Sequence, residues 1–193
     1  ARTQNPTRSA LEVNIAALEG AKFGYAFASG MSAIDAVLKL ISAGDHVILG
    51  DNTYGGTFRL FNRILVNYGV QFDVADTSDV TELEKAFKPN TKMLFVETPT
   101  NPVMTVTDLA AVSELAHARG AKVVCDNTFM SPYLQRPLTL GATIVLHSST
   151  KYIGGHSDLV GGLVVVADEE LLAVRGLVVQ ERIVDRPAPV HAV

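Results

Sequence analysis

Short apolar segments alternate with longer segments of helical periodicity along most of the chain. Most of the apolar segments are rich in β-branched residues, a pattern typical of strands buried in a sheet. They occupy residues 25–28, 46–50, 69–74, 93–97, 122–126, 142–146 and 163–166. Helical spacing of apolar residues is found in residues 8–18, 34–41, 58–68, 79–87 and 108–119. The pattern therefore predicts strands and helices in alternation.

This alternation, with short connections, predicts the α/β class: a mostly parallel sheet flanked by helices on both faces. The carboxyl ends of parallel strands meet at one edge of a sheet, and ligands bind beyond that edge. Gly30, Tyr54, Asn101 and Asp126 each follow a predicted strand, and Lys151 lies beyond the next apolar segment. We therefore expect these five residues to lie close together.

The residues around Gly30 are a candidate anion site. A predicted strand ends at Ser29-Gly30, where a predicted helix begins. The first N–H groups of a helix lack internal partners and bind anions such as phosphate, so Gly30 and Met31 are candidates to hold one. An ordinary tight turn from strand to helix explains the same residues equally well. Ser148 and Thr150 offer hydroxyl groups to the same anion.

Lys151 stands between a hydroxyl cluster and a glycine pair, in a polar loop between two apolar segments. Buried walls around a lysine favour its neutral amine, which can attack a carbonyl group. An amine nucleophile beside an anion site suggests a phosphorylated aldehyde, pyridoxal 5′-phosphate (PLP), attached to the lysine. A surface lysine in a Ser/Thr-rich loop is the simpler explanation for this residue alone. The interpretation therefore depends on the other groups that PLP needs.

Three further residues meet those needs. PLP acts as an electron sink when its ring nitrogen stays protonated, and a buried carboxylate such as Asp126 favours that form. Tyr54 is placed to stack on the ring, and Asn101 to hydrogen-bond the ring oxygen. Asp126 as a turn cap and Tyr54 as a packed loop residue are the commoner roles for such residues taken singly. Their joint occurrence on an alternating pattern favours the cofactor site.

Composition argues against several other classes of protein. The 193 residues are 48% hydrophobic and 19% charged, which fits a globular domain, and the net charge of -4 favours neither nucleic acid nor an anionic membrane. No apolar stretch is long enough to span a bilayer, and no Cys/His cluster has metal-ligand spacing. Cys125 is the only cysteine, which predicts a reducing compartment such as the cytoplasm. No predicted strand is followed by the Gly-x-Gly-x-x-Gly turn of nicotinamide-dependent oxidoreductases.

The segment Ser148-Ser-Thr-Lys-Tyr-Ile-Gly-Gly-His-Ser-Asp158 resembles the lysine signature of the Cys/Met-metabolism PLP enzymes. These include cystathionine γ-synthases, cystathionine β- and γ-lyases and methionine γ-lyases. The resemblance extends through Arg2–Arg8, Ala28–Met31, Gly44–His46, Tyr54–Thr57, Glu97–Pro102 and Asp126–Phe129. It covers roughly residues 2–170 and implies the large domain of a fold-type I PLP-dependent transferase.

The same resemblance implies a role for each candidate residue. Lys151 carries the cofactor, and Asp126 pairs with its ring nitrogen. Tyr54 stacks on the ring and assists catalysis, while Asn101 and Glu97 belong to the cofactor and substrate surround. The resemblance assigns the phosphate to Gly30, Met31, Ser148 and Thr150.

The two ends of the chain carry further expectations from the resemblance. Arg2 matches a family arginine that reaches the phosphate of the neighbouring subunit, which implies a homodimer or homotetramer with shared active sites. The tyrosine that accompanies this arginine in the family has no counterpart here. We expect residues 1–170 to be the PLP-binding large domain with its N-terminal segment truncated. We expect residues 171–193 to be a divergent tail, with the C-terminal domain of the family absent.

These features predict a trans-sulfuration enzyme of the cystathionine β/γ-lyase type, which cleaves a C–S bond of a sulfur amino acid. Methionine γ-lyases usually carry a cysteine where this chain has Gly56, which argues against that activity. The alternatives are a cystathionine γ-synthase, which joins cysteine to an O-acyl-homoserine, and a non-catalytic fragment of such an enzyme. The expected partner is a small amino-acid substrate, with no nucleic acid or membrane.

Overall fold

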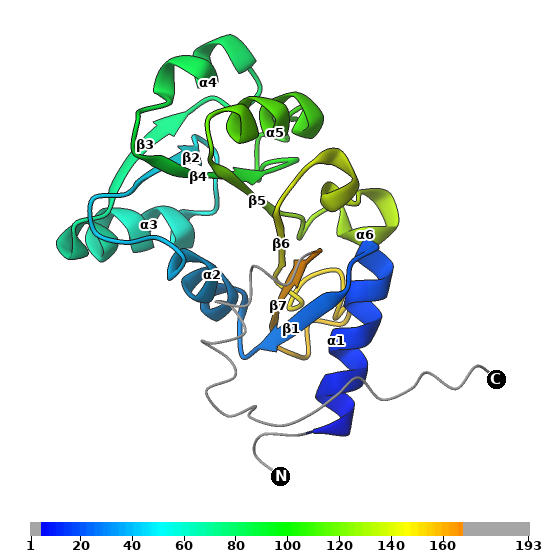
Figure 1. Ribbon diagram of the computed structural model, residues 1–193. Coiled ribbons are helices and arrows are strands. Elements are labelled where there is room, and N and C mark those ends of the chain that lie inside the picture. The colour runs from blue at the N-terminus through cyan, green and yellow to red at the C-terminus, as the bar shows by residue number, and fades with distance from the viewer. Residues whose placement is uncertain (1–4, 168–193) are drawn as a thin grey trace.

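The computed structural model describes residues 5–167, which form a seven-stranded sheet with helices on both faces (Figure 1). The strands are β1 (Phe23–Phe27), β2 (His46–Gly50), β3 (Gln71–Ala75), β4 (Thr91–Glu97), β5 (Lys122–Asp126), β6 (Ile144–His147) and β7 (Gly162–Val166). Their spatial order is β1-β7-β6-β5-β4-β2-β3. Strands β2 to β6 are parallel, whereas β7 is antiparallel to both β1 and β6. The mostly parallel sheet predicted from the sequence is therefore confirmed.

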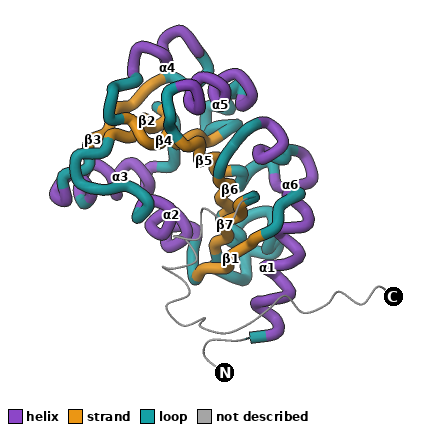
Figure 2. The backbone as a smooth tube through the Cα atoms, in the orientation of Figure 1, coloured by secondary structure: helices purple, strands orange, loops and turns teal. Residues whose placement is uncertain are grey.

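Helices cover both faces of this sheet. They are α1 (Pro6–Glu19), α2 (Gly30–Leu38), α3 (Gly55–Arg63), α4 (Val80–Ala86), α5 (Leu109–Ala118) and α6 (Ser131–Leu134), with two 3₁₀ turns, η1 (Leu65–Tyr68) and η2 (Pro137–Leu140). Figure 2 shows α2 and α3 on one side of the sheet and α4 and α5 on the other. Within residues 5–167, no helix combines the length and apolarity needed to cross a lipid bilayer.

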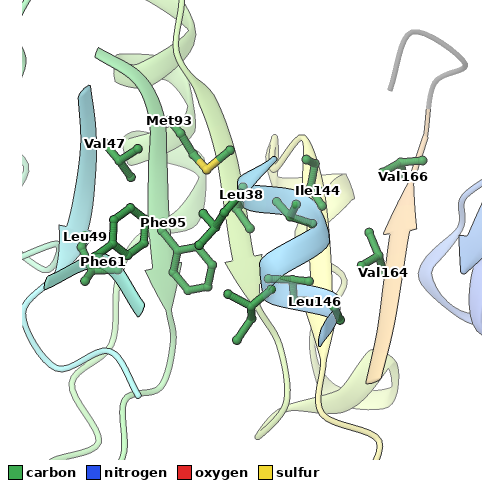
Figure 3. Packing of buried hydrophobic residues seen from close by; sticks show 14 of the residues in the cluster. Leu38, Val47, Leu49, Phe61, Met93, Phe95, Ile144, Leu146, Val164 and Val166 are labelled. Atoms are coloured by element: carbon green, nitrogen blue, oxygen red, sulfur yellow. The ribbon is translucent and has the colours of Figure 1, made fainter. Parts of the chain in front are cut away.

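The core consists of layers on the two faces of the sheet. Successive strand residues face opposite sides, so each buried strand supplies both layers. Val47 and Phe95 pack with Phe61 on the side of α2 and α3 (Figure 3). Ile48 and Leu94 join the cluster formed with α4 and α5. Burial on both faces explains why the strands read as near-continuous apolar runs.

The first helix begins earlier than the sequence predicts. We expected a helix over residues 8–18, but α1 begins at Pro6. Asn5 Oδ1 accepts hydrogen bonds from the N–H groups of Thr7 (2.9 Å) and Arg8 (3.3 Å). Asparagine is a favoured N-cap, and proline suits the first helical position, so the same residues start the helix directly.

The helix expected over residues 58–68 is two elements. Helix α3 begins at Gly55 and ends at Arg63, and the remainder forms η1. Gly69 has a φ of 79° and donates its N–H toward the carbonyl groups of Leu65 and Val66. This left-handed cap closes the segment with the tighter 3₁₀ turn before β3 starts.

The start of β7 approaches the start of α2 closely. Gly162 lies opposite Phe27 in the antiparallel pairing of β1 and β7. A Cβ atom at Gly162 would lie 2.1 Å from Ser29 O and 2.9 Å from Gly30 Cα. These are backbone atoms, so no side-chain rotation can relieve the overlap. Glycine at this position therefore lets α2 begin directly beside β7.

Gly162→Ala is expected to lower the free energy of unfolding by about 1–3 kcal/mol, because the added methyl group overpacks the contact with α2. Chemical denaturation of the two proteins measures the difference. Gly55→Ala is the matched control, since a Cβ atom there would meet the flexible tip of Arg59 at 3.4 Å. If Gly162→Ala is as stable as this control, the proposed close approach is wrong.

Candidate active site

A cavity of about 290 Å³ opens at the carboxyl edge of the parallel strands. Its wall contains every described residue that the sequence assigned to a cofactor: Gly30, Met31, Tyr54, Asn101, Asp126, Ser148, Thr150 and Lys151. These residues come from the start of α2 and from the ends and loops of β2, β4, β5 and β6. The remaining predicted residue, Arg2, lies outside the described residues. The fold therefore gathers positions that are distant in sequence around one space.

One end of the cavity is formed by the start of α2. Ser29 caps the helix, accepting a hydrogen bond from Ser32 N (3.1 Å), while Ser32 Oγ accepts one from Ser29 N (2.9 Å). A Cβ atom at Gly30 would lie 2.9 Å from Ser148 Cβ, so the absence of a side chain lets the helix start and the Ser148 loop approach each other. The first N–H groups of α2, at Gly30 and Met31, are suited to an anion at this end.

Thr150 holds the second half of the same loop. Its hydroxyl group accepts a hydrogen bond from Gly161 N (3.1 Å) and donates one to Gly161 O (3.2 Å). These contacts join the loop after β6 to the residue that precedes β7. Thr150 therefore orders the loop that contains Ser148 and Lys151, in addition to lining the cavity.

Asp126 lies at the tip of β5 and is buried. Burial raises the pKa of its carboxyl group, whereas two hydrogen bonds donated by Thr128, and to a smaller extent an electrostatic interaction with His147, act to lower it. Thr128 donates both its N–H (3.0 Å) and its hydroxyl group to Asp126 Oδ1. The carboxylate is therefore held in a fixed position at the cavity wall, as a partner for a cationic ring nitrogen requires.

Thr128 is a site residue that the sequence analysis did not assign. Its Oγ1 also accepts a hydrogen bond from Ser148 N (2.8 Å), so one hydroxyl group links Asp126 to the Ser148 loop. The spacing of Asp126 and Thr128 could have indicated the bond between them, because an aspartate often accepts a hydrogen bond from the residue two positions later. The contact with Ser148 depends on the pairing of β5 with β6 and could not be read from that spacing.

Glu97 connects two loops of the cavity. Its Oε2 accepts a hydrogen bond from Tyr54 N (2.8 Å). Burial and the neighbouring Asp126 carboxylate raise the pKa of Glu97 to about 7, although backbone hydrogen bonds from Tyr54 and Asn101 oppose the shift. Glu97 thus fixes the backbone of the loop that carries the Tyr54 ring.

Glu97→Gln is expected to flatten the pH dependence of stability of the cofactor-free protein. A folded-state pKa above the ordinary value of 4.5 means that the folded chain binds the proton more tightly than the unfolded chain. Stability is therefore highest below about pH 4.5, falls as the pH rises, and levels off above about pH 7. The substitution should remove a difference in the free energy of unfolding between low and high pH on the order of 1–2 kcal/mol. This figure allows for solvent screening, because Glu97 is only partly buried.

Chemical denaturation between pH 5 and pH 8 measures this effect. The exposed Glu114→Gln variant is the control and should keep the slope of the unmodified protein. If Glu97→Gln keeps that slope as well, the raised pKa is incorrect.

The Tyr54 ring is half-exposed at the mouth of the cavity. A Cβ atom at Gly56 would lie 2.4 Å from Tyr54 Cε1 and 2.9 Å from Met31 Sδ. The ring therefore lies over its own helix start and beside the start of α2. In this position it can cover a planar ligand in the cavity.

Lys151 lies in a turn on the cavity wall. Its N–H bonds to Ser148 O (3.2 Å), and its carbonyl group accepts from Gly155 N (2.8 Å). The sequence analysis expected buried walls around this lysine, but Lys151 is an exposed residue because the loop leaves the sheet at this point. Lys151 therefore lines the cavity while remaining exposed to solvent.

Neither histidine near the signature was given a chemical role from the sequence. His156 Nδ1 lies 3.0 Å from Gly154 O within the exposed loop. His147 is fully buried at the end of β6, with its Nε2 2.7 Å from Glu19 Oε1. His147 therefore contacts the end of α1 through Glu19, and it also belongs to the cavity wall.

Residues 1–186 match the family model of the Cys/Met metabolism PLP-dependent enzymes. The chain belongs to this family. PLP is the cofactor of the family, and the resemblance noted in the sequence is confirmed.

The relatives that this chain matches are named after three enzyme activities. The cystathionine γ-lyase of Bacillus subtilis is 55% identical over 170 residues, covering 88% of this chain and 45% of that protein. The cystathionine β-lyase of Lactococcus lactis subsp. cremoris is 54% identical over the same share of each chain. The cystathionine γ-synthase of Mycobacterium tuberculosis is 52% identical, covering 89% of this chain and 44% of that one. The chain spans about half the length of the curated relatives it matches.

Solved structures of family members have the same fold. The crystal structure of metB from Corynebacterium glutamicum superposes with a TM-score of 0.90 at 53% identity, over 92% of this chain and 47% of that one. The cystathionine γ-lyase of Lactobacillus plantarum, complexed with L-serine, gives 0.89 at 51% identity, over 92% and 46% of the two chains. The predicted fold-type I large domain is therefore confirmed.

The residues of the cavity fit the cofactor of this family. Glycine at position 30 lets the start of α2 and the Ser148 loop come together at one end of the cavity, where the first N–H groups of the helix are suited to a phosphate. A buried carboxylate stands at the tip of β5, and an amine lies on the wall formed by the loop after β6. Anion donors, carboxylate and amine are the three groups that PLP requires.

Proposed function

We propose that the protein holds PLP in this cavity and cleaves the C–S bond of a sulfur amino acid, as a trans-sulfuration enzyme of the cystathionine β/γ-lyase type. The observation that carries the proposal is the placement of Lys151, Asp126 and the start of α2 around one cavity. No two of these groups are adjacent in sequence, and each serves a different part of the same cofactor.

The position of each group in the cavity supports a separate binding role for it. The N–H groups of Gly30 and Met31, with Ser148 and Thr150, hold the phosphate. Asp126 pairs with the ring nitrogen and favours its protonated form. Tyr54 covers one face of the ring, and Asn101 donates to the ring oxygen.

Lys151 carries the chemical step. Its amine would hold the aldehyde of the cofactor and would accept the proton from the substrate Cα. PLP, when bound, supplies an electron sink for the pair left by that proton. Tyr54, at the mouth of the cavity, is placed to assist departure of the sulfur group. Expulsion of the thiol and hydrolysis then give a keto acid and ammonia.

The alternative is γ-replacement, in which the cysteine thiol displaces the acyloxy group from Cγ of an O-acyl-homoserine. Relatives named as lyases and relatives named as synthases both exceed 50% identity, so sequence similarity favours neither activity. Incubating the full-length protein with cystathionine distinguishes them, because a lyase releases pyruvate or 2-oxobutyrate. Formation of cystathionine from O-acyl-homoserine and cysteine, with no keto acid from cystathionine, would favour the synthase. A protein that takes up no PLP would be the non-catalytic form.

The assembly proposed is a homodimer or homotetramer in the cytoplasm, with Arg2 reaching the phosphate of the neighbouring subunit. Support comes from the match of Arg2 and the residues after it to the family segment. Sedimentation of the full-length protein tests the assembly. A monomer that retains full activity would exclude shared sites.

A further inference from the structure

Thr128 joins two parts of the cavity wall through a single hydroxyl group. It follows the tip of β5 and lines the cavity. Its Oγ1 accepts a hydrogen bond from Ser148 N at 2.8 Å and donates its proton to Asp126 Oδ1. Asp126 is the candidate partner of the ring nitrogen, and Ser148 belongs to the loop assigned to the phosphate. One side chain therefore contacts groups that we assign to two different parts of PLP.

The chemistry of the two neighbours fixes the direction of both hydrogen bonds. A backbone N–H can only donate, so Ser148 N occupies a lone pair of the Thr128 hydroxyl oxygen. The hydroxyl proton is then left for Asp126 Oδ1, which accepts it. A hydroxyl group with a single partner can rotate, but the bond from Ser148 holds this one in place. The loop after β6 thereby directs the Thr128 proton at the carboxylate.

Thr128 also determines which oxygen of Asp126 stays available. Within residues 5–167, both hydrogen bonds of the Asp126 side chain go to Oδ1, one from the Thr128 hydroxyl group and one from Thr128 N at 3.0 Å. Two donors occupy the two lone pairs of that oxygen. Because Asp126 lines the cavity, Oδ2 is the oxygen left for a donor inside it.

The buried setting makes these two bonds important for the charge of Asp126. The residue is only 8% exposed, so little water can replace a lost donor. Burial raises the pKa of the carboxyl group, and the bonds from Thr128 are the largest effects that lower it. The titratable neighbours on the adjacent strands, Glu97 and His147, make no hydrogen bond to Asp126 within the described part of the chain. Thr128 is therefore the group that holds this carboxylate directly.

We propose that Thr128 is a positioning residue for the active site: its hydroxyl group, oriented by Ser148 N, holds Asp126 through Oδ1 so that Oδ2 faces the cofactor's ring nitrogen. The inference rests on the proposed function, because it concerns bound PLP. It also assigns Ser148 to the phosphate through its hydroxyl group, since its N–H is bonded to Thr128. Thr128 acts through Asp126 and takes no part in the chemical step.

The test is Thr128→Val in the full-length protein loaded with PLP that is ¹⁵N-labelled at the ring nitrogen. Valine keeps the shape of the side chain and the N–H bond to Oδ1, but it removes the hydroxyl group. The ¹⁵N resonance distinguishes the protonated ring from the neutral one, and a pH titration gives the midpoint. This midpoint should fall by about one pH unit, because a hydrogen bond to a charged group contributes about a tenfold change in the equilibrium. Thr128→Ser keeps the hydroxyl group and should keep the midpoint.

Thr91→Val is the matched control. The Thr91 hydroxyl group is buried and has similar partners, accepting a hydrogen bond from Lys88 N at 2.8 Å and contacting the ring of His46 at 2.8 Å. Thr91 begins β4, whereas the cavity lies at the opposite end of that strand. Loss of a buried hydroxyl group as such should lower the thermal stability of both valine variants. Only Thr128→Val should move the midpoint.

An unchanged midpoint in Thr128→Val, with lower thermal stability, would show that Thr128 is only a structural support and would overturn the inference. An equal fall in Thr128→Ser would overturn it as well, because the hydroxyl group would not be the cause. If Thr128→Val does not fold, Thr128→Cys replaces it, since a thiol is a weak donor and acceptor and should also lower the midpoint. An unchanged midpoint in Thr128→Cys counts against the inference equally. If the unmodified protein takes up no PLP, the proposed function is refuted, and this inference with it.

Discussion

Lys151→Ala is expected to lower the rate of keto-acid release by about 10²–10⁴-fold or more, because it removes both the attachment point of PLP and the base that accepts the Cα proton. The visible absorbance of attached PLP should disappear with it. Folding should change little, since Lys151 is an exposed loop residue. Absorbance, the keto-acid assay and chemical denaturation of the same preparation measure the three quantities.

Lys122→Ala is the matched control. Lys122 is also exposed, but it begins β5, whereas the candidate site lies at the opposite end of that strand. This variant should keep both absorbance and turnover. Equal loss in the two variants, or normal turnover in Lys151→Ala, would remove Lys151 from the mechanism.

Asp126→Asn is expected to weaken PLP binding by about 10–100-fold, because a hydrogen bond to a charged group contributes about 1.5–3 kcal/mol. Turnover at saturating PLP should fall as well, since a neutral ring is a weaker electron sink. The free energy of unfolding should change by less than about 1 kcal/mol, because burial already disfavours the charge and asparagine can keep the bonds from Thr128. Equilibrium titration with PLP and denaturation of the cofactor-free protein measure these effects.

Asp108→Asn is the control for this substitution. Asp108 caps α5, accepting hydrogen bonds from the N–H groups of Ala110 and Ala111, and asparagine caps a helix equally well. Binding and stability should both stay unchanged in this variant. If Asp126→Asn mainly unfolds the protein and leaves PLP affinity intact, the carboxylate is a structural cap and not a partner for the ring.

The sequence was sufficient to predict the sheet and most of the site, because both depend on local patterns. Buried strands such as β2 and β5 are apolar on both faces, and the residues that follow them collect at one edge by the geometry of a parallel sheet. Asp126 and Lys151 could therefore be placed near each other without any knowledge of strand order. The antiparallel placement of β7 between β1 and β6 could not be predicted, since periodicity carries no information about neighbours.

The supporting contacts were not predictable for a related reason. Glu19 precedes a glycine at the end of a polar-faced helix, where an acidic residue is usually exposed to solvent. Its partner His147 is 128 positions away, and only the packing of α1 against the sheet brings the two together. Lys151 was expected near buried walls, yet it is exposed, because the pattern of neighbouring strands does not determine how far a loop projects. Burial of single polar residues is a tertiary property.

The most direct test of the account is borohydride reduction of the full-length protein incubated with PLP, followed by peptide mapping. Reduction fixes the cofactor to the amine that carries it. The account predicts the added mass of reduced PLP on Lys151, in the peptide that contains Ser148 and Thr150. A label on any other lysine, or no label despite bound cofactor, would contradict it.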